Sequence, residues 1–360
     1  MNLVDLAKEQ IRNTITNATK KCIDEGLFSL DGIPEIFVEK PKEKSHGDFA
    51  ANIALELTRI IKKNPREIAD MIVKNMDISD TFIEKVEVAG PGFINFFFKN
   101  EWFYSVIDVI LSEGDDYGRI DIGKNKKVMV EFVSANPTGP MHMGNARGGA
   151  IGDCLANLLK WAGFDVTKEF YINDAGNQIE KFAKSLEIRY RQLMGEDVVM
   201  PEDCYHGDDI TERVKEFLEK YGSLAEDFDK VRDRLVEYAL NKNISLMEEH
   251  LKRYGIEYDV WFRESSLYES NEVFETIEDL KKNGYTYEKD GALWFFASKV
   301  DESLKDEVLI RANGIPTYFA SDIAYHRNKF EKRKFDIVID IWGADHHGHI
   351  ARMKAALKAL

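Results

Sequence analysis

The sequence has few cysteines, no long apolar run and no signal-peptide core, and each shortage excludes a class of protein. The three cysteines, Cys22, Cys154 and Cys204, are odd in number and scattered, which favours a reducing cytoplasm over a secreted disulfide scaffold. No stretch of about 18 apolar residues is present, so no membrane span is predicted. The first residues begin an amphipathic helix that lacks the apolar core of a secretion signal. We therefore expect a cytoplasmic protein with no membrane partner.

Positive charge is also scarce. Lysine and arginine number 49 against 64 aspartates and glutamates, which gives a formal net charge of −15. Because phosphate contacts need basic residues, this balance is not typical of a nucleic-acid binder. Three basic runs, 40–44, 124–127 and 327–334, are candidates for local patches. We interpret each run as a solvated charged face, and a contact with RNA is the alternative.

The length predicts more than one domain. A chain of 360 residues suggests two or three domains, and 44% hydrophobic with 31% charged residues is typical of a globular protein. Residues 1–118 predict an α+β domain, followed by a polar linker around 114–126. Its expected helices are 2–25 and 50–75, and its expected strands are 36–40, 83–89 and 92–98.

Residues 119–360 predict a second domain of the α/β class. A strand at 127–132, a helix, a strand at 165–171 and a helix at 179–195 follow one another in βαβ order, which indicates a doubly wound parallel sheet. Residues 196–305 are interpreted as a mostly helical insertion in that sheet. The insertion's expected elements are helices at 209–219, 223–250 and 271–283 and a hairpin at 285–296. The sheet is expected to resume with strands at 305–311 and 335–342.

The most informative segment is 131–147, Glu131-Phe-Val-Ser-Ala-Asn-Pro-Thr-Gly-Pro-Met-His-Met-Gly-Asn-Ala-Arg147. It joins a predicted strand to a helix, so His142, Gly144 and Asn145 fall at the helix N-terminus, where free N–H groups and the helix dipole favour phosphate. Gly144 leaves room for a base or ribose. His142 and Asn145 offer donors for charge that develops on a phosphate. Cys154, on the apolar stripe of this helix, is predicted to be a small core residue.

The segment carries a family resemblance. His142-Met-Gly-Asn145 resembles the His-x-Gly-His/Asn signature of class I aminoacyl-tRNA synthetases, and Ser134, Asn136, Pro137 and Arg147 around it resemble the arginyl-tRNA synthetases in particular. Three further segments stand in the same order and at similar spacing to that family. They are Tyr171-Ile-Asn-Asp-Ala-Gly-Asn-Gln178, Thr317-Tyr-Phe-Ala-Ser-Asp-Ile-Ala-Tyr325 and Trp342-Gly-Ala-Asp-His-His-Gly-His349.

The resemblance implies a Rossmann-like class I catalytic domain behind an N-terminal additional domain that contacts tRNA. The implied reaction is the ATP-dependent attachment of L-arginine to tRNA(Arg) through arginyl-adenylate. ATP enters as a substrate with Mg²⁺, and we expect a monomer with no tightly bound cofactor and no protein metal site. His142 and Asn145 are the implied catalytic residues. The resemblance places ATP at His142, Gly144, Asn145, Gly343, Asp345, His346 and His349.

The expected arginine site follows from charge. A guanidinium is planar and always cationic, so a carboxylate beside an aromatic group suits it. Tyr318 and Asp322 are four residues apart and share one face of a helix, and the resemblance makes them the guanidinium contacts; the alternative is a packed tyrosine and a surface aspartate. The residues that the resemblance places around the substrate α-amino and carboxylate groups are Ser134, Asn136 and Gln178, and Glu131 is expected as a further acceptor. The alternative is ordinary turn chemistry, which also explains an Asn-Pro-Thr-Gly loop.

In the N-terminal domain the resemblance rests on Ser45-His-Gly-Asp-Phe-Ala-Ala-Asn52 and Gly90-Pro-Gly-Phe-Ile-Asn-Phe96. It suggests that Phe93 stacks on an exposed tRNA base while Asn95 hydrogen-bonds the base edge. The alternative is that Phe93 belongs to the core and Asn95 is an ordinary polar strand residue.

Two departures from the family pattern shape the expectation. The signature ends in Asn145, which donates a hydrogen bond but carries no charge. The Lys-Met-Ser-Lys loop and the anticodon-binding domain of the family are missing, so we expect an N-terminal fragment whose activity is impaired. Three alternatives remain: another class I synthetase, a non-catalytic synthetase-derived tRNA-binding protein, and a metal-dependent hydrolase that uses the histidines of 346–349.

Overall fold

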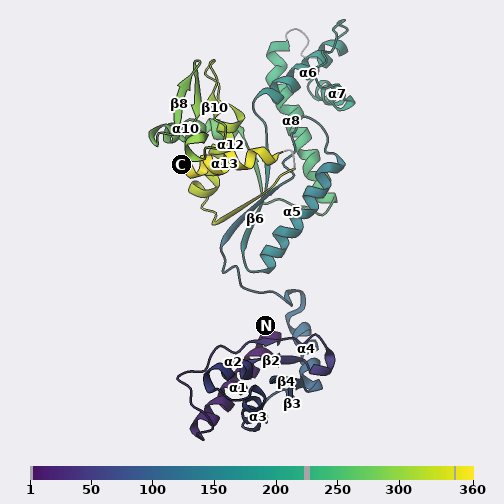
Figure 1. The fold of residues 1–360 in the computed structure, drawn as a ribbon. Coiled ribbons are helices and arrows are strands. Elements are labelled where there is room, and N and C mark those ends of the chain that lie inside the picture. Colours follow the sequence, from purple (N-terminus) through teal and green to yellow (C-terminus); the bar gives the residue numbers. More distant parts are fainter. Residues whose placement is uncertain (1–2, 223–227, 344–345) are drawn as a thin grey trace. The chain divides into compact units, whose positions relative to one another are not determined.

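The computed structural model describes residues 3–222, 228–343 and 346–360 (Figure 1). The chain divides into two compact units, Met1–Ile120 and Asp121–Leu360, and each is described by itself. Within the described residues, every helix is too short or too polar to cross a membrane.

The N-terminal unit packs helices on an antiparallel sheet of strand order β1-β2-β4-β3. Strand β4 lies between β2 and β3, and its Ile94 and Phe96 are fully buried against the helices. The elements of the unit are α1 (Leu3–Asp24), β1 (Val38–Glu39), β2 (Phe49–Ala51), α2 (Ile53–Ile61), α3 (Pro65–Lys74), β3 (Ile83–Ala89), β4 (Phe93–Phe98) and α4 (Asn100–Glu113), with short 3-10 turns at Lys44–His46 and Gly114–Asp116.

The single helix predicted at 50–75 is wrong, because the structure divides this stretch into β2, α2 and α3. Lys62 ends α2 in the left-handed region with φ of 57°. Asn64 then caps α3 by accepting the N–H of Arg66, and Pro65 occupies the first helical position, where its missing N–H costs nothing. The apolar residues keep a helical spacing on both sides of this break, and the spacing alone therefore predicted one helix. The dipeptide Asn64-Pro65 marks the break in the sequence.

The second unit is built on a wholly parallel sheet of order β11-β5-β6-β7, which confirms the predicted α/β class. Its elements are β5 (Lys127–Phe132), α5 (Met143–Trp161), β6 (Asp165–Ile172), α6 (Asn177–Leu193), α7 (Asp208–Tyr221), α8 (Phe228–Arg253), β7 (Val260–Arg263), α9 (Ser265–Glu269), α10 (Glu272–Lys282), β8 (Thr286–Lys289), β9 (Ala292–Phe295), α11 (Ala297–Val300), β10 (Glu307–Ile310), α12 (Tyr318–Arg327), the π-helical turn η3 (Asn328–Lys332), β11 (Ile337–Ile341) and α13 (His347–Ala359).

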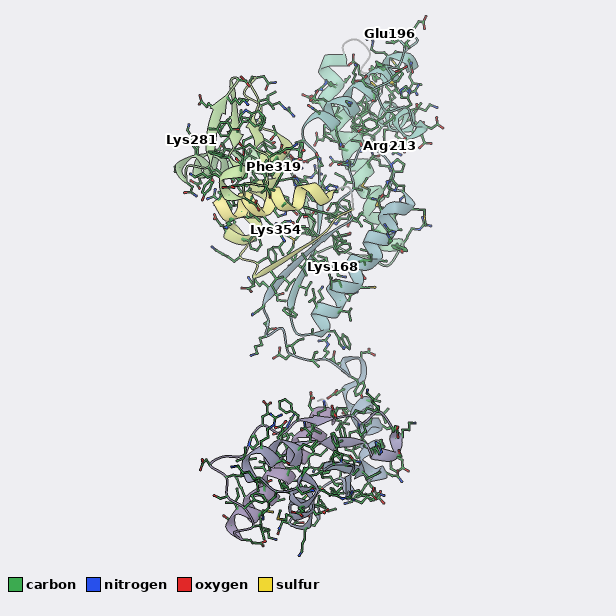
Figure 2. All side chains as sticks on the ribbon, viewed as in Figure 1. Lys168, Glu196, Arg213, Lys281, Phe319 and Lys354 are labelled. Atoms are coloured by element: carbon green, nitrogen blue, oxygen red, sulfur yellow. The ribbon has the colours of Figure 1, made fainter. Side chains whose placement is uncertain are left out.

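The pleat of the sheet gives its two faces different chemistry. Val128, Val130 and Phe132 of β5 point into an apolar cluster with α5 and α8. Lys168 of β6 lies on this side as well, and its Nζ is 2.5 Å from Asp153 Oδ1 of α5 (Figure 2). Acidic residues take the opposite face, which α12 and η3 cover.

Helix α5 packs on the sheet through its smallest residues. Gly149, Gly152 and Ala156 are buried, and a Cβ added to Gly152 would lie 2.1 Å from Phe132 Cγ. The prediction that Cys154 is a core residue is therefore wrong, because Cys154 is exposed. The large apolar side chains of α5 suggested one buried stripe, but only the glycine and alanine stripe lets the helix approach the sheet this closely.

One strand prediction in this unit also fails, and one strand of the parallel sheet was missed. Strand β10 does not join the parallel sheet; it pairs antiparallel with β9 in a three-stranded sheet of order β10-β9-β8. Strand β7, inside the predicted helical insertion, forms the edge of the parallel sheet beside β6. Both strands have four residues, and a pattern that short does not reveal which sheet a strand joins.

Candidate functional site

The residues around the N-terminus of α5 are arranged by two reciprocal hydrogen bonds. The Gly144 N–H donates to His142 Nδ1 (3.1 Å), and the His142 N–H donates to Asn145 Oδ1 (3.0 Å). Nδ1 and Oδ1 are thereby used as acceptors within a capping box. A neutral His142 must then carry its proton on Nε2, and Asn145 keeps its amide N–H groups free. The capping geometry thus orients both side chains as donors beside the positive end of the helix dipole.

A cavity of about 410 Å³ brings the signature together with the turn after β5. Ser134, Asn136, His142 and Asn145 all line it. The lining also contains residues that were not predicted from the sequence, namely Tyr205, His206 and Gly207 from the segment before α7 and Asp209 from its first turn. No signal in the sequence placed this segment near the signature, which lies some sixty residues earlier in the chain.

The turn after β5 is conformationally strained. Val133 and Ser134 both have positive φ, 69° and 41°, which is unusual for any side chain and especially for a β-branched one. Ser134 Oγ donates to Glu131 Oε1 (2.9 Å) and accepts the Tyr171 N–H (3.1 Å). Glu131, predicted as an acceptor for the substrate, is 5% exposed and its other oxygen is 2.7 Å from Lys329 Nζ. Its two oxygens therefore hold protein partners and fix the position of Ser134.

The predicted guanidinium pair lies on the first turns of α12. Tyr318 is 64% exposed, and Asp322 Oδ2 lies 3.1 Å from His349 Nε2. The His349 ring is 5.3 Å from Trp342 and 6.4 Å from Tyr318, measured between centroids. His349 was predicted at ATP, and the structure pairs it with the aspartate that was predicted at arginine. The remaining members of the predicted ATP set here are Gly343 and His346, both exposed, and Asp345, which lies outside the described residues.

A second carboxylate near Asp322 was missed from the sequence. Glu264, which follows β7, is 5% exposed, and its Oε1 accepts the Ser321 hydroxyl at 2.6 Å. Burial, together with the negative charge of Asp322, raises the pKa of Glu264 to about 7. The pKa of the Tyr171 hydroxyl is also raised, first by burial and then by the negative charges of Glu264 and Asp322. Two acids therefore gather around one tyrosine, and this electrostatic field favours a cationic ligand.

The basic run 327–334 is only in part the solvated face that we predicted, because Lys332 and Lys334 are exposed whereas two other cations of the run face the interior. Lys329 is fully buried, and its Nζ lies 2.7 Å from both Glu131 and Asp340. Arg333 pairs with Glu169, which is also fully buried. Lys329 and Arg333 therefore neutralise the acidic face of the sheet.

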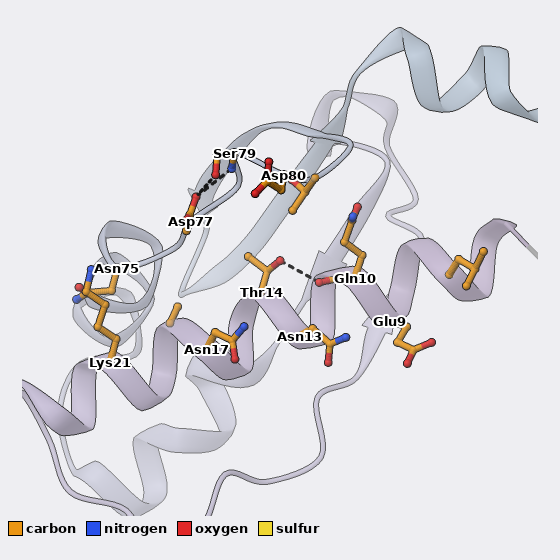
Figure 3. Close-up of a pocket in the computed structure, with 13 residues that line it drawn as sticks. Glu9, Gln10, Asn13, Thr14, Asn17, Lys21, Asn75, Asp77, Ser79 and Asp80 are labelled. Atoms are coloured by element: carbon orange, nitrogen blue, oxygen red, sulfur yellow. Dashed lines mark hydrogen bonds between the residues drawn. The ribbon is translucent and has the colours of Figure 1, made fainter.

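Gln178 is not among the residues that line the cavity at the N-terminus of α5. It is exposed on the first turn of α6. In the N-terminal unit, Phe93 is half-buried and Asn95 is only 4% exposed. Neither lines the unit's cleft of about 640 Å³, which lies between α1 and residues 75–81. That cleft carries Asn13, Asn17 and Lys21 on one wall, while Thr14 and Ser79 bond within their own segments (Figure 3).

Among the described residues, no three histidine, cysteine, aspartate or glutamate side chains gather in a way that suits a metal ion. His349 of α13 faces Asp322 and the aromatic rings of Phe319 and Trp342.

Comparison with known proteins extends these observations. Residues 8–98 match the family model of the arginyl tRNA synthetase N terminal domain, and residues 106–360 match that of the tRNA synthetases class I (R), catalytic domain. The chain is 58% identical to the arginine–tRNA ligase of Acetivibrio thermocellus over 99% of its length, and 58% identical to that of Caldanaerobacter subterraneus subsp. tengcongensis over 100%. It spans 64% of the length of each relative. The crystal structure of arginyl-tRNA synthetase from Plasmodium falciparum covers 98% of this chain with a TM-score of 0.58, and 62% of that chain is covered; at 17% identity this is a likeness of fold.

Proposed function

Because the chain belongs to the arginyl-tRNA synthetase family, we propose that it takes part in the ATP-dependent attachment of L-arginine to tRNA(Arg) through arginyl-adenylate. ATP enters with Mg²⁺, and the chain acts in the cytoplasm as a monomer. The observation that carries the proposal is a pair of acids, one on α12 and one directly after β7. Asp322 and the buried Glu264 lie beside Tyr171 and Ser321, where they form a polar site with a net negative charge.

The guanidinium end of arginine binds at this acidic pair. A guanidinium presents five N–H donors in a plane and cannot lose its proton. Asp322 and Glu264 supply carboxylate acceptors, and Tyr318 supplies an exposed aromatic ring on the same helix. A ligand with a neutral side chain of the same shape would leave both carboxylates without a cation. A buried carboxylate without a cation is destabilising, so such a ligand should bind more weakly.

The α-amino and carboxylate end of arginine lies toward the turn after β5, near Ser134 and Asn136, and Gln178 completes this end. His142 and Asn145 contact the phosphates of ATP through His142 Nε2–H and the Asn145 amide. The arginine carboxylate attacks the α-phosphorus of ATP, and pyrophosphate leaves. A ribose hydroxyl of the tRNA then attacks the carbonyl carbon of arginyl-adenylate, loses its proton, and AMP leaves. No protein nucleophile is needed, so the chain contributes by positioning the reactants and stabilising the developing negative charge.

The cavity of about 410 Å³ at the N-terminus of α5 supports this placement of the arginine carboxylate and the ATP phosphates. Ser134, Asn136, His142 and Asn145 share it, so one end of an adenylate and its phosphate would be bound by neighbouring side chains. Gly144, Gly343, Asp345 and His346 remain proposed contacts of the nucleotide, and His349 is proposed to orient Asp322. For tRNA we retain Phe93 alone, because Asn95 is buried in the central strand of its sheet.

Calorimetric titration of the purified chain with L-arginine and L-citrulline tests the proposal. Citrulline keeps the shape of arginine but has no charge. We expect arginine to bind and citrulline not to bind, and we expect Asp322→Asn to weaken arginine by about 10- to 100-fold, the usual loss for a charge-assisted hydrogen bond. Equal affinity for the two ligands would contradict the charge-based assignment.

A further inference from the structure

One row of acids crosses the parallel sheet beneath α12 and η3. In the register of the sheet, Asp340 of β11 lies beside Glu131 of β5, which lies beside Glu169 of β6. All three carboxylates point to the same face, because all three contact side chains of α12, η3 and the residue that follows η3. Neighbouring like charges in a sheet are destabilising unless they are neutralised.

The side chains that contact the row of acids, two of them cations, come from a helical segment with an unusual turn. Tyr325, Lys329 and Arg333 are spaced four residues apart and all reach the acids: Tyr325 and Arg333 contact Glu169, and Lys329 contacts Glu131 and Asp340. The turn η3 is π-helical, and it closes with the Arg333 N–H donating to the Asn328 carbonyl at 3.0 Å. A π turn within an α-helix is uncommon and often marks a functional site.

Lys329 lies at the centre of a continuous hydrogen-bonded path. Toward β5, Lys329 Nζ donates to Glu131 (2.7 Å), whose other oxygen accepts the Ser134 hydroxyl (2.9 Å). Toward α12, Lys329 Nζ donates to Asp340 (2.7 Å), whose other oxygen lies 3.1 Å from His326 Nε2. The opposite ring nitrogen of His326 lies 2.8 Å from the carbonyl oxygen of Asp322.

The path is buried and electrostatically balanced. Lys329 is 0% exposed, and the side chains of Glu131, Asp340 and His326 are 6%, 17% and 6% exposed. Burial opposes the charge on Lys329, but the two carboxylates raise its pKa above the ordinary value. Burial likewise opposes the charge on Asp340, but Lys329 and His326 lower its pKa. Both ring nitrogens of His326 face oxygen atoms, one of the Asp340 carboxylate and one of the Asp322 carbonyl.

The two ends of this path are the two ends of the proposed arginine site. Ser134 belongs to the turn proposed for the α-amino and carboxylate groups, and Asp322 belongs to the acids proposed for the guanidinium. We infer that Lys329 is a positioning residue that fixes the distance between these two ends, and that it thereby sets the length of side chain that the site accepts. This inference rests on the proposed function.

The alternative is that Lys329 only stabilises the fold, and the chain offers a matched control for that alternative. Arg333 is also a cation from the same helical segment, and it also faces a buried acid, Glu169. It contacts neither Glu131 nor Asp340 in any hydrogen bond or ion pair found among the described residues. Lys329→Met and Arg333→Met both leave a buried carboxylate without its cation, but only Lys329→Met interrupts the path.

The test measures length selectivity by calorimetry for the parent chain and for the two variants. The ligands are L-arginine, L-norarginine, which is one methylene shorter, and L-homoarginine, which is one methylene longer. One methylene is worth about 10- to 200-fold in a well-fitted site, so the parent chain should prefer arginine over both homologues by at least ~10-fold. In Lys329→Met we expect that preference to fall below about threefold, whereas Arg333→Met should retain the parental preference.

The outcomes separate the inference from the proposed function. An unchanged preference in Lys329→Met, or an equal loss in Arg333→Met, overturns the positioning role while arginine binding by the parent chain still stands. No arginine binding by the parent chain overturns the proposed function and the inference with it. If Lys329→Met does not fold, Asp340→Asn decides the question, because it keeps the side-chain shape and weakens the links to both Lys329 and His326. Retained selectivity in a folded Asp340→Asn overturns the inference.

Discussion

The buried carboxylate of Glu264 predicts that arginine binding depends on pH near neutrality. Its pKa is raised to about 7 by burial and by the charge of Asp322, so close to half of the ligand-free molecules carry a proton there at pH 7. A bound guanidinium favours the ionised carboxylate. Arginine binding should therefore release a proton from Glu264, and the affinity for arginine should rise with pH.

The size of the effect follows from the ionised fraction. With a pKa of about 7, roughly nine tenths of the molecules are ionised at pH 8, about half at pH 7 and about one in eleven at pH 6. The affinity should fall about twofold from pH 8 to pH 7 and about fivefold from pH 7 to pH 6. At pH 7, binding should release about 0.5 proton per arginine.

Calorimetry in two buffers of different ionisation enthalpy measures both quantities, because the difference in apparent heat gives the number of protons released. Glu264→Gln is the matched control, since it keeps the shape of the side chain but cannot titrate. We expect this variant to bind arginine more weakly and with no proton release between pH 6 and pH 8. Arginine binding by the parent chain with no proton exchange over this range would refute the assignment of Glu264 to the cation site.

Two further predictions concern stability. The pKa of Glu264 is raised from 4.5 to about 7 in the folded chain, so its stabilising contribution is present below about pH 4.5 and is lost as the pH rises through 7. In thermal unfolding at pH 8 without ligand, Glu264→Gln should therefore be more stable than the parent by up to about 3 kcal/mol. A lower melting temperature of this variant would count against the raised pKa. Gly152→Ala should destabilise the second unit by about 1–3 kcal/mol in urea unfolding, because the added Cβ would meet the Phe132 ring at 2.1 Å. Gly148→Ala is the control and should be neutral or stabilising, because no neighbouring atom lies within 4 Å of a Cβ added there. Equal effects of the two changes would contradict the packing account.

Several features of the second unit could be predicted because they are local in sequence. The bounds of β5 agree with the predicted strand at 127–132, and α5 follows the polar turn as expected. A strand, a turn rich in proline and glycine, and a helix cap are each specified by adjacent residues. Tyr318 and Asp322 do lie on one helix, since a spacing of four residues is itself a helical relation.

The features that could not be predicted depend on residues far apart in the chain. Glu264 reaches Ser321 across 57 residues, and Lys329 reaches Glu131 across 198. In the sequence Glu264 stands among polar residues and Lys329 stands in a basic run, and both patterns are typical of a surface. Burial of these charges depends on the register of the parallel sheet and on the π turn, which pair each charge with a partner. No periodicity in either segment signals this pairing.

The central claim is that the residues at the N-terminus of α5 and the acids at α12 serve one ligand. The most direct measurement is calorimetric titration with an arginyl-sulfamoyl-adenosine analogue of the adenylate, which carries both chemical ends in one molecule. We predict one bound analogue per chain at an affinity at least ~100-fold above that of L-arginine, with weakening by Asn145→Ala and by Asp322→Asn, whereas L-arginine alone should be weakened only by Asp322→Asn. An analogue that binds no better than L-arginine, or that is insensitive to Asn145→Ala, would contradict the account.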